Sequence, residues 1–496
     1  MANKEQQIKN SLLYLLPTII TSVLPFLTIH IFTRILTRED YGVLALAQIY
    51  AIFVNGLANF GMTAAYERDY FQYREDRLKT PQLLYSILLF VMLNFLLLAL
   101  STYVFRKPLS NLIIGSTEHG NILFLAFCAQ FFYSVNYYYL TYFKNSETAR
   151  DFVAYTIFGT LINFIISLFL VAYLRIGVVG LIYAQLCSGA TIFGIMSYRF
   201  TASLPVSLSM PILSKSLQIA YPLTPRIFLG VVATQFDKYM IGLLASVGGV
   251  GVYSIGQKIS YVIFTYMTAI ENVFSPQVYK RMFDLEDKGG AAIGKYITPF
   301  AYISIFLALL VALFSEEVIF ILTPPPFHDA IDIVAVLSMY YGLLFFGKLN
   351  GPQLIFTKKT HLTSLLTMGR IGINVGLNIP FIMRWGAIGA AWATLLAGLI
   401  SGALSFLVAQ HYYEIKWEYR RIGSIFLTFF GSTILLIVLR EGDVSYYARM
   451  AIKLTSICVY IYTGVKAGIV TTDNFALVKN VLIGPGLQMV KRRTTE

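Results

Sequence analysis

Two stretches of the sequence, RIGVVG at residues 175–180 and RWGAIG at residues 384–389, repeat one pattern at an offset of 209 residues. The same offset relates YGV at residues 41–43, followed by Gln48, to VGV at residues 250–252, followed by Gln257. One offset shared by regions more than 100 residues apart indicates an internal duplication. The sequence therefore predicts a protein with two related halves.

The composition places both halves in a membrane. Hydrophobic residues make up 57% of the chain, charged residues 13%, and the mean hydropathy is +0.68. A soluble domain carries roughly 25% charged residues, so this chain cannot cover a soluble surface. Apolar runs of about 20 residues recur, and such runs cross a bilayer as α-helices. We predict an all-α membrane protein of about fourteen spanning helices, near residues 12–32, 42–61, 83–103, 121–142, 152–174, 176–197, 216–236, 250–275, 296–315, 331–349, 363–383, 386–410, 422–439 and 447–465.

The repeat and the helices together predict the domain organisation. Each repeat holds six helices, and an even number leaves the two halves parallel, related by a pseudo-twofold axis along the membrane normal. We expect a six-helix lobe at residues 1–200, a Ser- and Pro-containing cytoplasmic linker at 201–215, a second six-helix lobe at 216–410, and two extra helices with a basic tail at 411–496. A ligand of such a bundle is expected between the lobes, near the midplane.

The basic residues predict the orientation. With the N-terminus in the cytoplasm, the inner segments hold 25 Lys and Arg residues, counting Lys348 at the inner end of its span among them, and the outer segments hold 8. Five more fall within the predicted spans, namely Arg226, Lys258, Arg370, Arg449 and Lys453. Both termini are thus expected in the cytoplasm, with the first apolar run as a spanning helix rather than a cleaved signal. The net charge of +13 is explained by this bias and by attraction to anionic lipids, not by nucleic-acid binding.

Several motifs resemble the polysaccharide transporter branch of the multidrug/oligosaccharidyl-lipid/polysaccharide (MOP) exporter superfamily. They are Pro17, Arg34-Ile35-Leu36, Glu39-Asp40-Tyr41-Gly42 and Ala45 in the first half, and Pro222, Asp237-Lys238, Gly251-Val252-Tyr253-Ser254, Lys258-Ile259, Asn374, Asn378, Pro380 and GAIGAAWAT at residues 386–394 in the second. The resemblance implies a Wzx-type flippase in a bacterial inner membrane, which moves undecaprenyl-pyrophosphate-linked oligosaccharides for O-antigen, capsule or exopolysaccharide synthesis by alternating access. It also implies a glycosyltransferase and polymerase pathway as partners. Fourteen helices leave the related lipid II flippases as an alternative.

A lipid-linked oligosaccharide needs a polar, cationic cavity that opens sideways to the bilayer. A charge at a span centre costs about 2.5–3.5 kcal/mol on insertion scales, so each one needs a reason. Arg226, close to Pro222 and Pro225, together with Arg370 and Lys258, is expected to bind the anionic substrate. Ion pairing and snorkelling to the interface are the alternatives. Lys453 is expected to be peripheral, facing lipid headgroups or the neighbouring helix.

Polar and acidic side chains complete the expected site. Substrate contacts are expected from two stripes at helical spacing, Gln48, Asn55 and Asn59 in one helix and Gln130, Tyr133 and Tyr137 in another. Hydrogen bonding between helices is the alternative for both. Glu271 is the candidate for ion coupling or for pairing with a base. Gate salt bridges are possible roles for Asp237, Lys238 and Arg34, with anchoring at the membrane interface as the alternative. Proton relay is a possible role for His30, with packing in a hydrogen-bonded position as the alternative.

No feature of the sequence predicts a catalytic residue, metal site or cofactor. The three cysteines Cys128, Cys187 and Cys458 lie within apolar runs and form no metal motif. Residues 289–295 match the glycines and lysine of a phosphate-binding loop, but Tyr296 replaces its hydroxyl residue and no strand precedes it. An ion-coupled multidrug exporter of the same superfamily is the main alternative function. A membrane polysaccharide polymerase or ligase is disfavoured, because the outer loops are too short for a catalytic platform.

Overall fold

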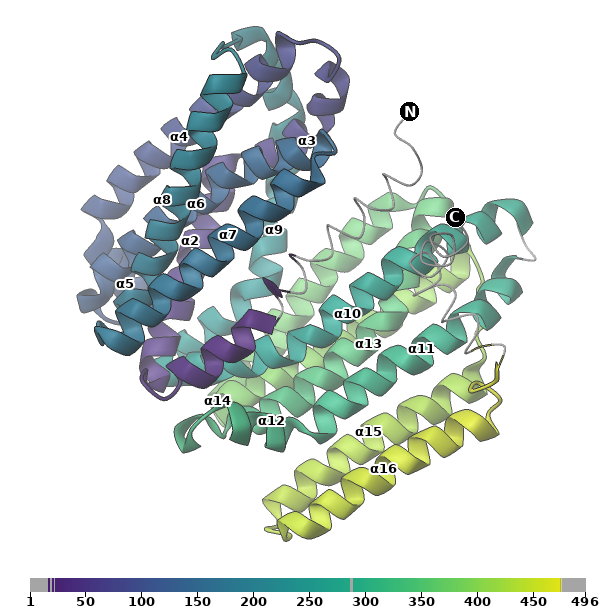
Figure 1. Cartoon of the computed structure of the whole chain (residues 1–496). Coiled ribbons are helices and arrows are strands. Elements are labelled where there is room, and N and C mark those ends of the chain that lie inside the picture. The colour runs from purple at the N-terminus through teal and green to yellow at the C-terminus, as the bar shows by residue number, and fades with distance from the viewer. Residues whose placement is uncertain (1–16, 18–19, 22, 286–288, 473, 475–496) are drawn as a thin grey trace, which may run out of the picture. The chain divides into compact units, whose positions relative to one another are not determined.

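The protein is helical throughout the part that the structure describes. The computed structural model describes residues 17, 20–21, 23–285, 289–472 and 474, apart from the side chains of residues 226, 227, 232 and 273. All regular elements in these ranges are helices (Figure 1). The predicted all-α membrane fold is therefore confirmed.

Contacts divide the chain into two units. The first comprises Met1–Ser254 together with Leu322–Pro326. After an apolar helix at Val23–Phe32, it contains α2 (Arg38–Asn59), α3 (Met62–Tyr73), α4 (Lys79–Val104), α5 (Arg106–Ile114), η1 (Thr117–His119), α6 (Gly120–Asn145), α7 (Ala149–Ser167), η2 (Leu168–Tyr173), α8 (Val178–Ser203), α9 (Met210–Leu244) and the start of α10 (Val247–Leu285). Its core lies where α2 and α6 pack together and where α9 packs on α2 and α3.

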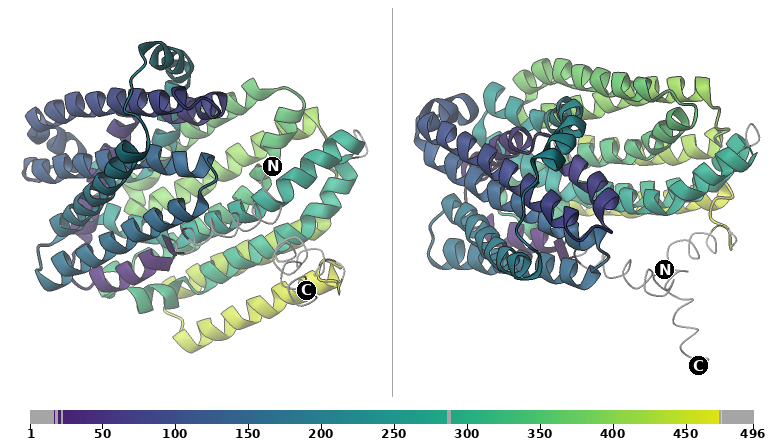
Figure 2. Two further views of the ribbon diagram at one scale, coloured as in Figure 1. Left: turned by 45° about the horizontal axis from the view of Figure 1, so that its top comes forward. Right: turned by 90° about the horizontal axis from the view of Figure 1, so that it is seen from above.

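The second unit comprises Ile255–Ile321 and Phe327–Glu496. It contains the rest of α10 and then α11 (Gly289–Leu313), α12 (Ser315–Leu322) apart from its last residue, α13 (Ala330–Phe356), α14 (Thr360–Tyr412), α15 (Tyr419–Glu441) and α16 (Tyr446–Lys466). Most of η4 (Pro325–Phe327) belongs to the first unit. The helices α15 and α16 form an antiparallel pair that packs along α11, as the views in Figures 1 and 2 show.

Each predicted span corresponds to a helix, the first being described only over Val23–Phe32. Among the described residues, eight helices are long and apolar enough to cross a membrane, or nine if the two parts of α9 form one span. This criterion does not confirm the number fourteen. One reason is that α14 counts once, although its backbone leaves the helical conformation at Gly386 and so separates two predicted spans.

The bounds of the helices confirm the repeat. Helices α2 and α10 begin 209 residues apart, as do α5 and α12. The breaks that precede α8 and the second part of α14 fall at Gly177 and Gly386, with φ values of 74° and 61°. A positive φ combined with a ψ of −153° or −136° favours glycine, because a residue with a side chain is strained in that backbone conformation. The matching RIGVVG and RWGAIG stretches thus encode the same helix break.

The repeat also sets a reciprocal contact inside the first unit. A Cβ atom at Gly42 of α2 would lie 1.9 Å from the carbonyl oxygen of Val247, and one at Gly251 of α10 would lie 2.1 Å from that of Arg38. Arg38 and Val247 are themselves 209 residues apart. The first turns of α2 and α10 therefore cross at backbone contact, each presenting its glycine to the other, and only glycine permits this approach.

Glycines also explain the stretch that resembles a phosphate-binding loop. A Cβ atom at Gly290 would lie 2.0 Å from the carbonyl oxygen of Glu414, and one at Gly294 would lie 2.0 Å from that of Lys416. The backbone N–H of Lys416 donates to the carbonyl oxygen of Gly290 at 3.2 Å. The glycines at the start of α11 thus let the segment that joins α14 to α15 pass at backbone distance.

Contacts between helix ends agree with the predicted sidedness. Segments predicted outside meet one another, as where Thr33 donates to the carbonyl oxygen of Leu322 at 3.2 Å. Segments predicted inside also meet one another: Lys144 pairs with Glu67 at 3.3 Å, and Gln82 donates to Ser207 at 3.3 Å. These pairings support the alternation of loops, and the charge bias alone predicts which side is cytoplasmic.

Cysteine labelling tests that direction. In a variant without the native cysteines, Glu75→Cys between α3 and α4 is expected to resist a membrane-impermeant thiol reagent in intact cells. Glu118→Cys in η1 is expected to react, because its segment carries few basic residues and is predicted outside. Both side chains are exposed, so burial does not explain a difference. If the Glu75→Cys protein is labelled before permeabilisation and the Glu118→Cys protein is protected, the predicted orientation is wrong and the protein is inserted the other way round.

Candidate functional site

The polar stripe of α2 is tied into the helix packing of the first unit. The side-chain amide of Asn59 donates to the Oδ1 atom of Asn55 at 2.7 Å and to the hydroxyl of Ser134 at 2.7 Å. Its own Oδ1 atom accepts from the hydroxyl of Tyr138 at 2.8 Å. Asn59 is buried, and these bonds join α2 to α6. They match the alternative of hydrogen bonding between helices, while Gln48 remains half-buried on α2.

The stripe on α6 has a different setting. Tyr133 is 68% exposed and Tyr137 is 37% exposed, while Gln130 on the same face is half-buried. The adjacent face of α6 carries the buried Ser134 and Tyr138. The stripe is thus turned away from the core of its unit, and its substrate contacts stay a prediction.

Glu271 is held by a base that the sequence analysis did not select. Its carboxylate lies 2.6 Å from the ammonium of Lys348. Lys348 lies at the inner end of the predicted span 331–349 and was counted with the following inner loop, whereas α13 continues to Phe356 and places Lys348 well inside a span. Lys348 could have been identified from the sequence if the predicted helix had been extended past this charged residue. The expected pairing of Glu271 with a base is present, but the base is Lys348.

The three predicted substrate-binding bases lie on three different helices. Lys258 is exposed on α10 and Arg370 is half-buried on α14. Arg226 lies in α9, and its side chain is outside the described part of the structure. Their binding roles stay predictions.

The predicted gate residues make contacts near their own helix ends. Asp237 accepts from the hydroxyl of Tyr253 at 3.1 Å, a bond from α10 to α9 within the first unit. Lys238 donates to the side-chain oxygen of Gln235 at 3.4 Å. Arg34 donates to the carbonyl oxygen of His30, whose side chain is exposed. A gating or proton-relay role for any of them stays a prediction.

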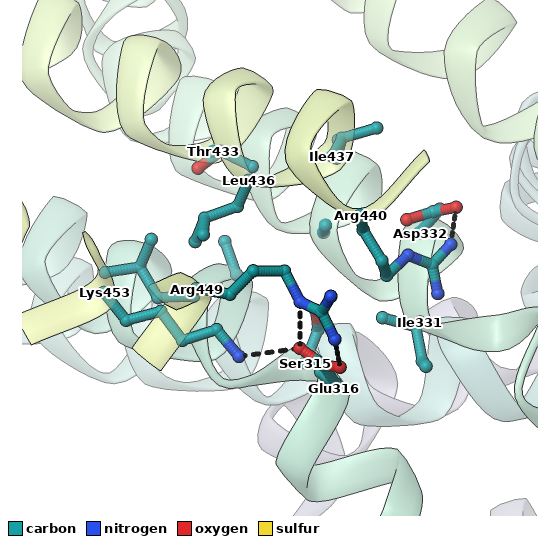
Figure 3. A pocket seen from close by; sticks show the side chains of 13 residues that line it. Ser315, Glu316, Ile331, Asp332, Thr433, Leu436, Ile437, Arg440, Arg449 and Lys453 are labelled. Atoms are coloured by element: carbon teal, nitrogen blue, oxygen red, sulfur yellow. Dashed lines mark hydrogen bonds and ion pairs between the residues drawn. The ribbon is translucent and has the colours of Figure 1, made fainter. Parts of the chain in front are cut away.

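A buried ionic cluster attaches α16 to α12. The ammonium of Lys453 lies 3.0 Å from Glu316, and the guanidinium of Arg449 lies 2.5 Å from Glu316 (Figure 3). The same ammonium lies 2.6 Å from Glu317. Burial alone would raise the pKa of Glu316, but hydrogen bonds from Arg449 and Lys453 outweigh it and hold this pKa below its ordinary value. Lys453 therefore does not face lipid headgroups, because two carboxylates of α12 draw it inward.

Further contacts join α15 to α13 and α16 to α11. Arg440 at the end of α15 pairs with Asp332 at the start of α13, in the same cleft (Figure 3). The hydroxyl of Tyr460 donates to the carbonyl oxygen of Tyr302 at 2.7 Å, and Gly464 leaves room for the Tyr302 ring. The charged residues of this cleft thus fasten α15 and α16 to the helices that precede them.

Comparison with known proteins places the chain in a family. The model of a family described as polysaccharide biosynthesis protein matches residues 31–331, well over half of the chain. The chain belongs to this family. A probable low-salt glycan biosynthesis flippase, Agl15, of Haloferax volcanii is 24% identical over 195 residues, which are 39% of this chain and 41% of the relative. The chain thus spans about two-fifths of the length of that curated relative.

Solved structures share the fold of this polysaccharide biosynthesis family member. An inward-facing multidrug resistance MATE family transporter of the MOP superfamily matches with a TM-score of 0.65 at 16% identity, over 81% of this chain and 97% of that one. The lipid II flippase MurJ, in an inward closed conformation, matches with a TM-score of 0.66 at 16% identity, over 91% and 98%. A MATE transporter of Vibrio cholerae matches with a TM-score of 0.56 at 14% identity, over 82% and 96%. The predicted membership of a polysaccharide biosynthesis family is confirmed, and the fold is shared with a transporter of the MOP superfamily and with a lipid II flippase.

Proposed function

We propose that the protein is a flippase that moves a lipid-linked oligosaccharide, carried on undecaprenyl pyrophosphate, from the cytoplasmic to the outer leaflet of a bacterial inner membrane. The match to the polysaccharide biosynthesis family over residues 31–331 carries this proposal. A relative described as a probable glycan biosynthesis flippase supports the assignment as a flippase. Family and fold favour a transporter over a polymerase or ligase.

The proposed mechanism is alternating access between two six-helix lobes, residues 1–200 and 216–410, joined by the linker at 201–215. Basic residues within the helices would neutralise the pyrophosphate, and exposed tyrosines such as Tyr133 would contact sugar rings. The intramembrane bases Lys258, Lys348 and Arg370 support an anionic rather than a cationic substrate. The residues 411–496 would attach to the second lobe, and both termini would be cytoplasmic. Glycosyltransferases that build the unit and a polymerase that consumes it would act in the same pathway.

Deletion of the gene tests the proposal. Surface polysaccharide is expected to fall, and undecaprenyl-linked repeat units are expected to accumulate in the cytoplasmic leaflet, because their sugars cannot cross hydrocarbon unaided. The measurement is mass spectrometry of extracted lipid-linked intermediates together with quantitation of surface polymer. Complementation by the wild-type gene is the control.

The same experiment decides between substrates. Unchanged polymer together with new sensitivity to cationic drugs would replace the proposal by a multidrug exporter, an interpretation that the MATE-like fold supports. Loss of cell-wall integrity with accumulation of lipid II would favour a lipid II-type flippase. The sugars of the natural substrate follow from the composition of the accumulated lipid.

A further inference from the structure

Two ion pairs within the helices of the second unit differ in how deeply they are buried. The side chains of Lys453 and Glu316 are 2% and 5% exposed, so this pair is sealed inside the packing. The side chains of Lys348 and Glu271 are 17% and 25% exposed, although both belong to segments predicted to span the membrane. A sealed pair can only hold helices together, whereas a partly open pair can also be reached by a ligand.

One face of α10 holds the Lys348 ammonium. Phe264, Thr268 and Glu271 follow one another at spacings of four and three residues, so they share a helix face. The ammonium lies 2.6 Å from the Glu271 carboxylate, 3.4 Å from the Thr268 hydroxyl and 4.8 Å from the centre of the Phe264 ring. A lysine ammonium has three N–H donors, and the Thr268 contact is long. The only anion among these three contacts is Glu271.

The helix that carries Lys348 is open beside it. Positions 347 and 351 of α13 are glycines, and a Cβ atom at either would meet no atom within 4 Å. At 1.5 Å per residue, Lys348 lies roughly 27 Å from the Ala330 end of α13 and roughly 12 Å from the Phe356 end. Under the proposed orientation, the Phe356 end is cytoplasmic. Lys348 therefore lies in the inner half of the span, where a lipid from the cytoplasmic leaflet would present its phosphates.

We propose that Lys348 is a substrate-binding residue, that Glu271 neutralises it in the empty protein, and that the diphosphate of the lipid-linked substrate displaces Glu271 from Lys348. This inference rests on the proposed flippase function and names a residue of its site. An unpaired ammonium in a span is costly, so an internal carboxylate stabilises the empty site. Lys348, Thr268 and the open glycine face then offer charge, a hydroxyl donor and space to an anion.

Binding of a short diphosphate lipid to the purified full-length protein tests the exchange. The probe is geranylgeranyl diphosphate, titrated in nanodiscs, with geranylgeraniol as the neutral comparison. Lys348→Met is expected to weaken diphosphate binding at least about tenfold, since it removes a charged hydrogen-bond donor. Glu271→Gln is expected to strengthen it severalfold, because the internal competitor for Lys348 is neutralised. Neither variant should alter binding of the alcohol.

The double variant Glu271→Gln/Lys348→Met separates binding from folding. It leaves no unpaired charge, so its thermal unfolding should resemble that of the wild type, yet it should bind diphosphate as weakly as Lys348→Met. Lys280→Met, at an exposed position of α10, is the matched control for loss of a positive charge and should bind normally. A double variant that binds diphosphate as well as the wild type would reduce the pair to a structural role, with the proposed function intact. If the wild-type protein binds no diphosphate lipid, both the binding role of Lys348 and the proposed flippase function are overturned.

Discussion

Lys453→Met is expected to lower the free energy of unfolding by about 3–5 kcal/mol, the usual cost of removing one partner from a buried ion pair. Lys453 is 2% exposed and lies between Glu316 and Glu317. Arg449 still neutralises Glu316, but the half-buried Glu317 is left without its ammonium. The measurement is the thermal unfolding midpoint of the purified protein in detergent, together with its abundance in the membrane.

Two further variants show whether charge is the cause. Lys466→Met makes the same substitution at an exposed position of the same helix, α16, and should leave the midpoint unchanged. Glu317→Gln/Lys453→Met should recover part of the loss, because the uncompensated carboxylate becomes neutral. A Lys453→Met protein as stable as Lys466→Met would mean that the cluster does not fasten α16.

Gly42→Ala and Gly251→Ala are expected to abolish transport, because a Cβ atom at either position would overlap a backbone carbonyl at 1.9 or 2.1 Å. No rotamer change relieves a clash with backbone, so the first turns of α2 and α10 must move apart. Overpacking of this kind costs about 1–3 kcal/mol, and occasionally more. Surface polysaccharide in a deletion strain that expresses each variant gives the readout, with abundance measured in parallel.

The control for these variants lies on the same helix. A Cβ atom at Gly56 of α2 would meet no atom within 4 Å. Gly56→Ala should therefore keep transport and should stabilise α2 by about 0.5–1 kcal/mol, since alanine is the better helix former. Normal transport by both Gly42→Ala and Gly251→Ala would show that the close crossing is dispensable.

Much of the fold was predictable because it depends on local and periodic features. Apolar runs locate the helices, and the shared offset of 209 residues identifies the duplication before any contact is known. The breaks at Gly177 and Gly386 fall at matching positions of the same pattern, where the backbone conformation favours glycine. The division of contacts at Ser254 was not predictable, since it depends on α9 packing against α2 and α3.

The polar residues were harder to interpret, because their partners are distant in the sequence. Asn59 was selected correctly as a polar residue within a span, yet its bonds to Ser134 and Tyr138 lie 75 and 79 residues away and connect helices. Glu271 was selected as a candidate for ion coupling or for pairing with a base, but Lys348 is 77 residues away and was counted with a loop. Lys453 was predicted to be peripheral, because no sequence pattern indicates that α16 packs against the glutamates of α12.

The repeat has a consequence for how such a chain could have arisen. An ancestral unit with six crossings begins and ends on the same side of the membrane, so a head-to-tail gene fusion joins two copies without inverting either one. Under the predicted topology, the helices α15 and α16 would add two more crossings and again preserve the side on which the chain ends. Their attachment depends on charged side chains of α12, in a position that corresponds to α5 of the first copy, where Arg106 begins the helix and no paired glutamates occur. The acquisition of Glu316 and Glu317 would have given only one of the two copies a place for an accessory pair, and so marked the point at which the duplicates ceased to be interchangeable.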